Sequence, residues 1–156
     1  MATEQEKIAH RARMWGLTTV GMTLGIWEMV EESATSLTPI IGAQLIGEIE
    51  KQLGLEIAGE KPQDLFVDLG RIFVDEYGFG SEVKVESADK TTHVTFQHAA
   101  GSPEFAMLKE RGVEKLFSHP FLCAGIAALA RMGVKARGSV EVNKAAISQT
   151  ITFELL

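Results

Sequence analysis

The stretch from Ser118 to Leu156 limits the possible folds more than any other part of the chain. It opens with an almost wholly apolar run, His119–Met132, that is followed by Gly133. Pro120 suits the first turn of a helix, Ser118 or His119 can cap it, and a glycine is typical of the residue after its end. Because the run is apolar nearly all round, we expect a helix covered on more than one side.

Two strands follow this helix. Apolar and polar residues alternate over 134–142 and again over 145–155. A period of two with one apolar side indicates antiparallel strands that lie on a core. A two-residue turn through Asn143 and Lys144 would complete the hairpin. In that register Gly138 lies opposite Gln149.

Gln149 is an amide on an otherwise apolar strand face, and this leaves two interpretations open. In the first, Gly138 leaves space beside Gln149, and the pair forms a small apolar cavity with one polar group. In the second, Gly138 marks a β-bulge that turns Gln149 toward solvent or a backbone group. Interior strand glycines often mark bulges, so the second interpretation is favoured.

The N-terminal part reads as helical. A polar lead-in over residues 1–15 precedes a more apolar helix, Leu17–Glu32, in which Gly21 and Gly25 lie one turn apart. Small residues at this spacing let two helices approach closely. In a soluble chain this is more often packing within the fold, but a dimer contact through Gly21, Gly25 and Trp27 is the alternative.

Two more helices are expected before the sheet begins. The first opens at Thr38-Pro39 and ends at Gly54, and the second starts at Pro62. The second carries Phe66 and Phe73 on its apolar stripe. These rings either fill the core, which is the favoured interpretation, or line a ligand pocket.

The whole chain is therefore predicted to form one α+β domain, residues 1–156, with helices packed on one face of a four-stranded antiparallel sheet. A buried crossover helix separates the two hairpins. The expected segments are a helical lead-in (1–15), a helical layer (16–78), a first hairpin (79–99), a crossover with the buried helix (100–133) and a second hairpin (134–156).

Composition excludes several functional classes. A formal net charge of −6 provides no basic surface for nucleic acid. A single cysteine cannot form an internal disulfide and favours a reducing, cytoplasmic setting, and the N-terminal residues do not resemble a signal peptide.

We find no phosphate-binding or dinucleotide-binding glycine motif, no nucleophile elbow and no zinc-ligand cluster. His119 and Cys123 lie four residues apart, but an inert buried thiol beside a capping histidine is favoured over a reactive pair.

Three short motifs resemble the 4-vinyl reductase domain, a small-molecule-binding module also called hydrocarbon-binding protein. They are Tyr77-Gly78-Phe79-Gly80 before the first strand, Phe121–Leu129 before the last hairpin, and the closing Thr152-Phe153-Glu154-Leu155. Distant relatives of that family include the tethering subunits of the TRAPP complex and haem-based nitric oxide sensors. The resemblance implies a dimer with an apolar pocket between helices and sheet.

One departure from this family bears on metal binding. The family often has cysteines in its final hairpin, and the matching positions here are Asn143 and Ile151. Neither side chain is a soft metal ligand, so the resemblance implies that a metal site is lost in this chain.

The leading functional hypothesis is a non-catalytic homodimer that binds a small apolar molecule, without cofactor, metal, catalytic residue or membrane span. An assembly protein that makes a dimeric scaffold contact is the alternative, and a reductase, by family analogy alone, is the third. The expected ligand-binding residues come from helices and strands on both sides of the presumed pocket: Phe66, Phe73, Leu122, Ile126, Gly138, Gln149 and Ile151.

Overall fold

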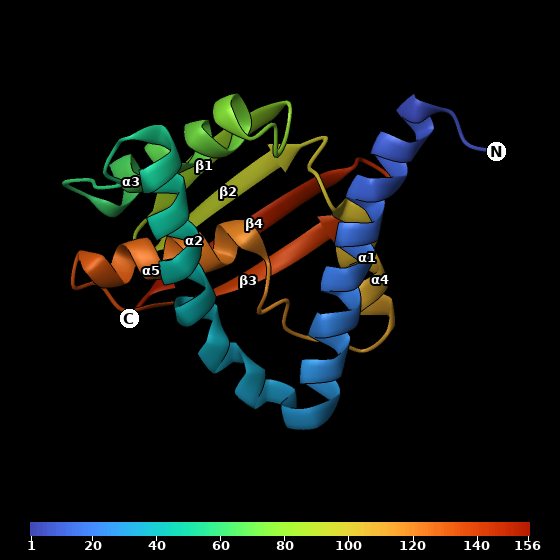
Figure 1. The fold of residues 1–156 in the computed structure, drawn as a ribbon. Coiled ribbons are helices and arrows are strands. Elements are labelled where there is room, and N and C mark those ends of the chain that lie inside the picture. The colour runs from blue at the N-terminus through green and yellow to red at the C-terminus, as the bar shows by residue number, and fades with distance from the viewer.

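The computed structural model describes residues 1–156 and places helices on one face of a four-stranded antiparallel sheet (Figure 1). The strand order is β1-β2-β4-β3, so each hairpin pairs its own strands and β2 joins β4 at the centre. The predicted α+β class and both hairpins are confirmed. The strands are β1 (Glu82–Ala88), β2 (Thr91–Gln97), β3 (Ala136–Asn143) and β4 (Ser148–Leu155).

The register of the second hairpin differs from the prediction. Asn143 pairs with Ser148, so the turn has four residues instead of two, and Gly138 lies opposite Phe153. The pairing runs without interruption from Ala136 to Asn143, which rules out a bulge at Gly138. The offset along β4 is an even number of residues, so the predicted inward and outward faces are still correct.

The helix α5 (Pro120–Arg131) lies between the sheet and α2 (Thr38–Leu53), as Figure 1 shows. A β-carbon on Gly125 would lie 2.5 Å from the Phe153 ring, so α5 rests directly on β4. A β-carbon on Gly42 would overlap the Cys123 carbonyl, so α2 in turn rests directly on α5. The predicted crossover helix is therefore covered on both sides.

The predicted ends of these two helices are also correct, because Gly54 and Gly133 both adopt left-handed φ angles, 64° and 75°. The start of α2 differs in one respect. Thr38 does not cap the helix; its Oγ1 donates to the Phe117 carbonyl oxygen at 2.9 Å.

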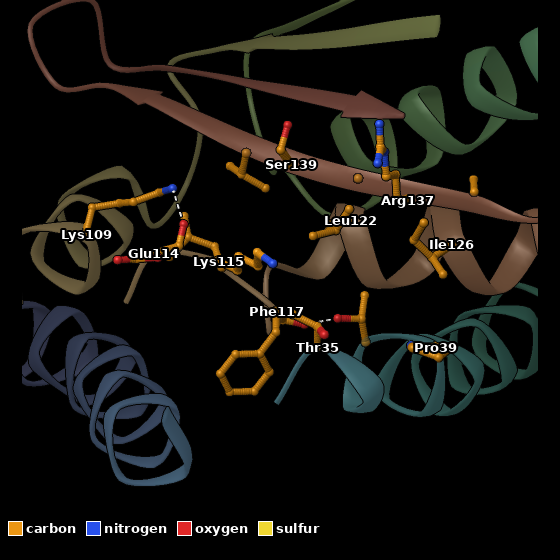
Figure 2. Close-up of a pocket in the computed structure, with 15 residues that line it drawn as sticks. Thr35, Pro39, Lys109, Glu114, Lys115, Phe117, Leu122, Ile126, Arg137 and Ser139 are labelled. Carbon is orange, nitrogen blue, oxygen red and sulfur yellow. Dashed lines mark hydrogen bonds between the residues drawn. The ribbon is translucent and has the colours of Figure 1, made fainter. Parts of the chain in front are cut away.

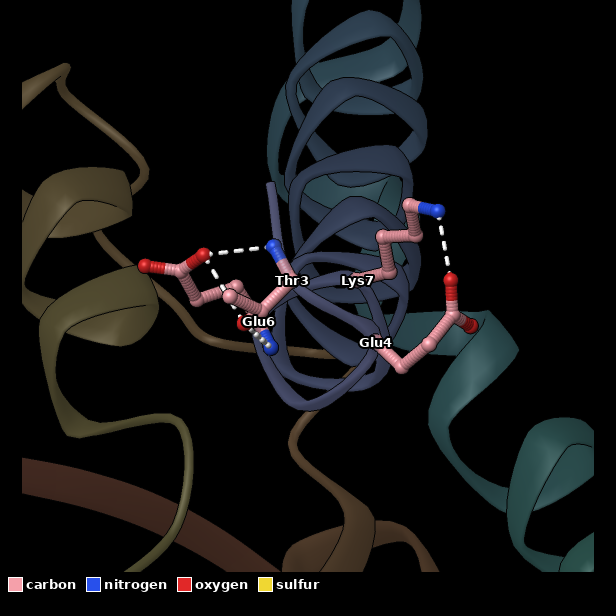
Figure 3. A network of polar contacts seen from close by, with 4 residues as sticks. All are labelled: Thr3, Glu4, Glu6 and Lys7. Atoms are coloured by element: carbon pink, nitrogen blue, oxygen red, sulfur yellow. Dashed lines mark hydrogen bonds and ion pairs between the residues drawn. The ribbon is translucent and has the colours of Figure 1, made fainter. Parts of the chain in front are cut away.

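The lead-in and the following helix form one continuous helix, α1 (Glu4–Val30), and not two. No proline or other strong helix-breaking signal separates the two segments, and Gly16 is tolerated within the helix. Thr3 and Glu6 form a capping box at its start, and Lys7 pairs with Glu4 at 2.6 Å (Figure 3). Such reciprocal bonds satisfy free N–H groups of the first turn.

Most of α1 is exposed. Val20 and Thr23 are its only buried residues, and the helix contacts the rest of the fold mainly through α4 (Ser102–Glu110) and the 3₁₀ segment η1 (Glu31–Leu37). None of the helices is both long enough and apolar enough to cross a membrane.

The core lies between the sheet and the pair α5 and α3 (Pro62–Arg71), which a π-type turn η2 (Ile72–Glu76) extends. Phenylalanine rings dominate this core. Phe66 stacks on Phe153 with ring centroids 4.3 Å apart, and Phe73 meets Phe121 edge-on at 5.0 Å. Since both Phe66 and Phe73 are buried in this cluster, the interpretation of these rings as core is correct.

Candidate functional site

A cavity of about 410 Å³ lies beside β3, the strand at one edge of the sheet. Its walls come from β3, the first turns of α5, the η1–α2 junction, the end of α4 and the loop before α5 (Figure 2). The volume is within the range of small-molecule pockets. The lining residues are Thr35, Thr38, Pro39, Lys109, Glu114, Lys115, Leu116, Phe117, Leu122, Ile126, Ala136, Arg137, Gly138, Ser139 and Val140.

The apolar wall of this cavity depends on a close approach between α5 and β3. A β-carbon on Gly138 would overlap the Leu122 Cδ1 atom, so the glycine lets Leu122 pack against the strand. The space directly beside Gly138 is thus filled by Leu122, and both residues form part of the cavity wall together with Ile126, Ala136 and Val140.

The opposite rim is polar and carries charge. Lys109 Nζ donates to the Glu114 carbonyl oxygen at 2.8 Å, and Figure 2 shows this bond on the far side of the cavity from Ile126. Lys115 forms an ion pair with Glu32 at 3.2 Å. Arg137 contributes its backbone, because its side chain points along the outer face of the sheet toward Glu154. An apolar wall with a charged rim suits an apolar molecule that has one polar end.

Gln149 takes part in a closed polar network away from this cavity. Its Oε1 lies 2.7 Å from His119 Nε2, and its Nε2 donates to the Ala100 carbonyl oxygen at 3.0 Å and to Ser102 Oγ at 2.8 Å. Neither sequence interpretation described this arrangement in full. The amide does bond a backbone group, but it is fully buried and no bulge is present.

The same network determines which ring nitrogen of His119 carries the proton. Its Nδ1 accepts the Leu122 N–H at 3.3 Å, which caps α5, so the ring proton is on Nε2 and points to Gln149. Burial lowers the pKa of His119 to about 4, against a smaller opposing effect of the Gln149 bond. His119 is therefore a neutral structural residue at neutral pH.

The expected ligand-binding residues divide into two groups. Leu122, Ile126 and Gly138 line the cavity, whereas Phe66, Phe73, Gln149 and Ile151 lie in the packed core. The sequence analysis missed the polar rim of Lys109, Glu114 and Lys115. Lys109 lies in the last turn of α4, and Glu114 and Lys115 lie in the loop before α5. None of the three is part of a sequence pattern that relates it to β3.

Of the three residues expected in a dimer contact, one packs inside the fold and two border open space. Trp27 packs within the chain, stacked on Phe117 with ring centroids 6.5 Å apart. Gly21 and Gly25 meet nothing within 4 Å of an added β-carbon, so the glycine pair makes no close packing inside the fold.

The single thiol of the chain is buried and hydrogen-bonded. Cys123 Sγ donates to the Phe117 carbonyl oxygen, and burial raises the pKa of this thiol to about 12. The prediction of an inert cysteine beside a capping histidine is therefore correct. Asn143 accepts the Ala146 N–H in its turn and Ile151 is buried, and no group of His, Cys, Asp and Glu side chains could hold a metal ion.

Comparison with known proteins gives a likeness of fold. The chain is similar to trafficking protein particle complex subunit 3 from Naegleria fowleri, a crystal structure with covalently bound palmitic acid. The TM-score is 0.65 over 95% of this chain and 96% of that chain, at 12% sequence identity. No family model matches the sequence, and no curated protein does.

Proposed function

We propose that this protein is a non-catalytic binding domain that holds a small apolar molecule in the cavity beside β3. The observation that carries the proposal is the cavity of about 410 Å³ between Leu122, Ile126 and β3, next to a core packed with phenylalanine and aliphatic side chains. Burial of ligand carbon supplies the affinity, about 25 cal/mol per Å² before the costs of binding. The working unit is a homodimer, and the lone buried thiol favours a cytoplasmic location.

The chemistry of this chain favours a ligand held without a covalent bond. The subunit of similar fold carries palmitic acid covalently, and acylation of a protein thiol needs an accessible thiolate. The only thiol here is Cys123, which is buried, hydrogen-bonded and high in pKa. A fatty acyl chain is therefore a suitable probe, with its carboxylate at the Lys109 and Lys115 rim.

Titration calorimetry with palmitate below its micellar concentration tests the proposal. Ala136→Phe places a ring in the cavity and is expected to lower palmitate affinity at least tenfold. Ala130→Phe, on the exposed side of α5, is the matched control and keeps the affinity of the natural chain. Equal binding by both variants, or no binding by the natural chain, contradicts the proposal. Native mass spectrometry of gently purified protein then identifies the natural ligand.

A second candidate function, an assembly protein, is supported by the exposed face of α1. Four large apolar side chains recur at every seventh residue: Ile8, Trp15, Met22 and Met29 are 64%, 67%, 64% and 83% exposed. No charged residue occurs between Arg13 and Glu28. A regular apolar stripe of this kind is typical of helices that pair with another helix, and the open surface at Gly21 and Gly25 adjoins it.

The oligomeric mass of Gly21→Leu tests this second candidate. We expect the bulky side chain to weaken the α1 contact and shift the protein toward a smaller assembly. Gly47→Leu on α2, where an added side chain also meets open space, is the control and keeps the natural mass. An unchanged mass in Gly21→Leu and in Met22→Glu contradicts the α1 contact.

A further inference from the structure

The backbone of β3 has one side without a partner. Lys135 lies opposite Leu156 just outside the paired strands, and its carbonyl oxygen accepts the Leu156 N–H at 2.9 Å. Opposed residues of an antiparallel pair alternate between bonded and non-bonded. The odd-numbered residues of β3 therefore bond to β4. The N–H and C=O groups of Ala136, Gly138, Val140 and Val142 point away from it and form what we call the free edge.

Two hollows border the free edge, and residues of α4 line the second of them. The cavity described above borders Ala136–Val140, and a second hollow of about 730 Å³ borders Val140–Lys144. The strand has eight residues and contains no proline or bulge. A long regular edge without such protection is a template for another strand.

We propose that the free edge pairs with the β3 strand of a second copy of this chain, antiparallel and centred on Ser139. In this register Gly138 bonds to the partner's Val140, and Ala136 to the partner's Val142. Arg137 then lies directly opposite the partner's Glu141, and the two-fold axis repeats this pair on the other side of Ser139.

Charge selects both the partner and the register. Arg137 pairs with Glu154 on β4, whereas Glu141 has no cationic partner within the chain. Pairing about Ser139 gives each Glu141 an arginine. The neighbouring registers that use the same backbone groups place Arg137 opposite Ser139 or Asn143 instead. Opposite charges at facing positions stabilise a strand pair, and like charges destabilise it.

The inner face of the same pairing is apolar. The partner's Val140 and Val142 lie beside Gly138 and Ala136, the two residues that line the cavity next to Leu122 and Ile126. The contact is separate from the exposed face of α1. Two different two-fold contacts in one chain generate a closed tetramer or a linear assembly.

Charge reversal tests the register. Arg137→Glu and Glu141→Arg each create two repulsive pairs, so each variant alone is expected to self-associate at least about tenfold more weakly in analytical ultracentrifugation. An equimolar mixture of the two variants restores opposite charges at both positions and is expected to recover the association. Lys84→Glu, on the outer face of edge strand β1, is the matched control and leaves the mass unchanged.

A cysteine at the centre provides a second, independent measurement. Ser139 faces the partner's Ser139 at a non-bonded position, where α-carbons lie about 4.5 Å apart, close enough for a disulfide. Under mild oxidation Ser139→Cys is expected to form a covalent dimer, whereas Lys84→Cys is not. The proposal is overturned if the charge reversals keep the natural mass, if their mixture fails to restore it, or if Ser139→Cys cross-links no more than Lys84→Cys. Gly21→Leu, which tests α1, leaves the cross-link in place.

Discussion

His119 Nε2 lies 2.7 Å from Gln149 Oε1 in the interior, and this bond ties the start of α5 to the centre of the sheet. Gln149 then continues to Ala100 and Ser102, and Ser102 Oγ donates to the Ala99 carbonyl oxygen. No buried side-chain polar atom lacks a partner. The helix that carries the cavity wall is therefore held in position by a polar chain that does not touch the cavity.

The first prediction concerns acid stability. The pKa of His119 is lowered from 6.5 in the unfolded chain to about 4 in the fold, so the folded state takes up this proton only at lower pH. The stability that neutral His119 contributes to the fold is complete above pH 6.5 and is lost as the pH falls toward 4. Between pH 7.5 and 4.5 the free energy of unfolding should fall by about 2–3 kcal/mol from this group. Urea unfolding at stepped pH measures it.

His119→Asn retains a capping acceptor for α5 but has no group that titrates in this range. The steep fall in the free energy of unfolding between pH 6.5 and 4.5 should disappear in this variant. It should persist in His10→Asn, which replaces an exposed histidine on α1. The same slope in both variants would show that His119 is not its source.

The second prediction concerns Gln149 itself. Gln149→Leu leaves the His119 Nε2–H and the Ala100 carbonyl oxygen without partners, which should lower the free energy of unfolding by about 2–4 kcal/mol. Gln97→Leu, an exposed glutamine on the neighbouring strand β2, should change it by less than about 0.5 kcal/mol. Chemical denaturation compares the two. Similar effects at both positions would mean that the network adds no stability.

The third prediction uses two glycines of α2 that share a helix but not an environment. An added β-carbon at Gly42 overlaps the backbone of Cys123, which cannot move aside, whereas Gly47 faces open space. Gly42→Ala should destabilise by about 3 kcal/mol or more, because α2 must separate from α5. Gly47→Ala should stabilise by about 0.5–1 kcal/mol. Thermal unfolding measures both changes in stability. A change of the same sign in the two variants would refute the close contact between α2 and α5 at Gly42.

The fourth prediction concerns the turn between β3 and β4. Ile147 adopts a left-handed φ of 51° with its side chain about half exposed, a costly conformation for a β-branched residue. Ile147→Gly should therefore raise the free energy of unfolding by about 1 kcal/mol. Ala145→Gly in the same turn relieves no strain and should lower it slightly. A loss of stability in Ile147→Gly would indicate that the side chain contributes more packing than the strain costs.

Local patterns were sufficient for the main elements. The ends of α2 and α5 follow from Pro39, Gly54, Pro120 and Gly133, and the two hairpins follow from alternation with a period of two. These signals act within one or two turns of the chain, so the sequence contains them directly. The inward faces of β3 and β4 were predicted correctly for the same reason, since an even shift in register does not exchange the faces.

Contacts between distant segments decided the rest. Gly138 is a glycine because Leu122 packs against it, Gln149 is buried because His119 and Ser102 meet it, and Gly42 is a glycine because α2 crosses α5 there. Each of these facts depends on a side chain or backbone group that is remote in sequence, and no period or cap encodes such a partner. The cavity beside β3 and the free edge arise in the same way, because only the folded sheet determines which strand is left at its side.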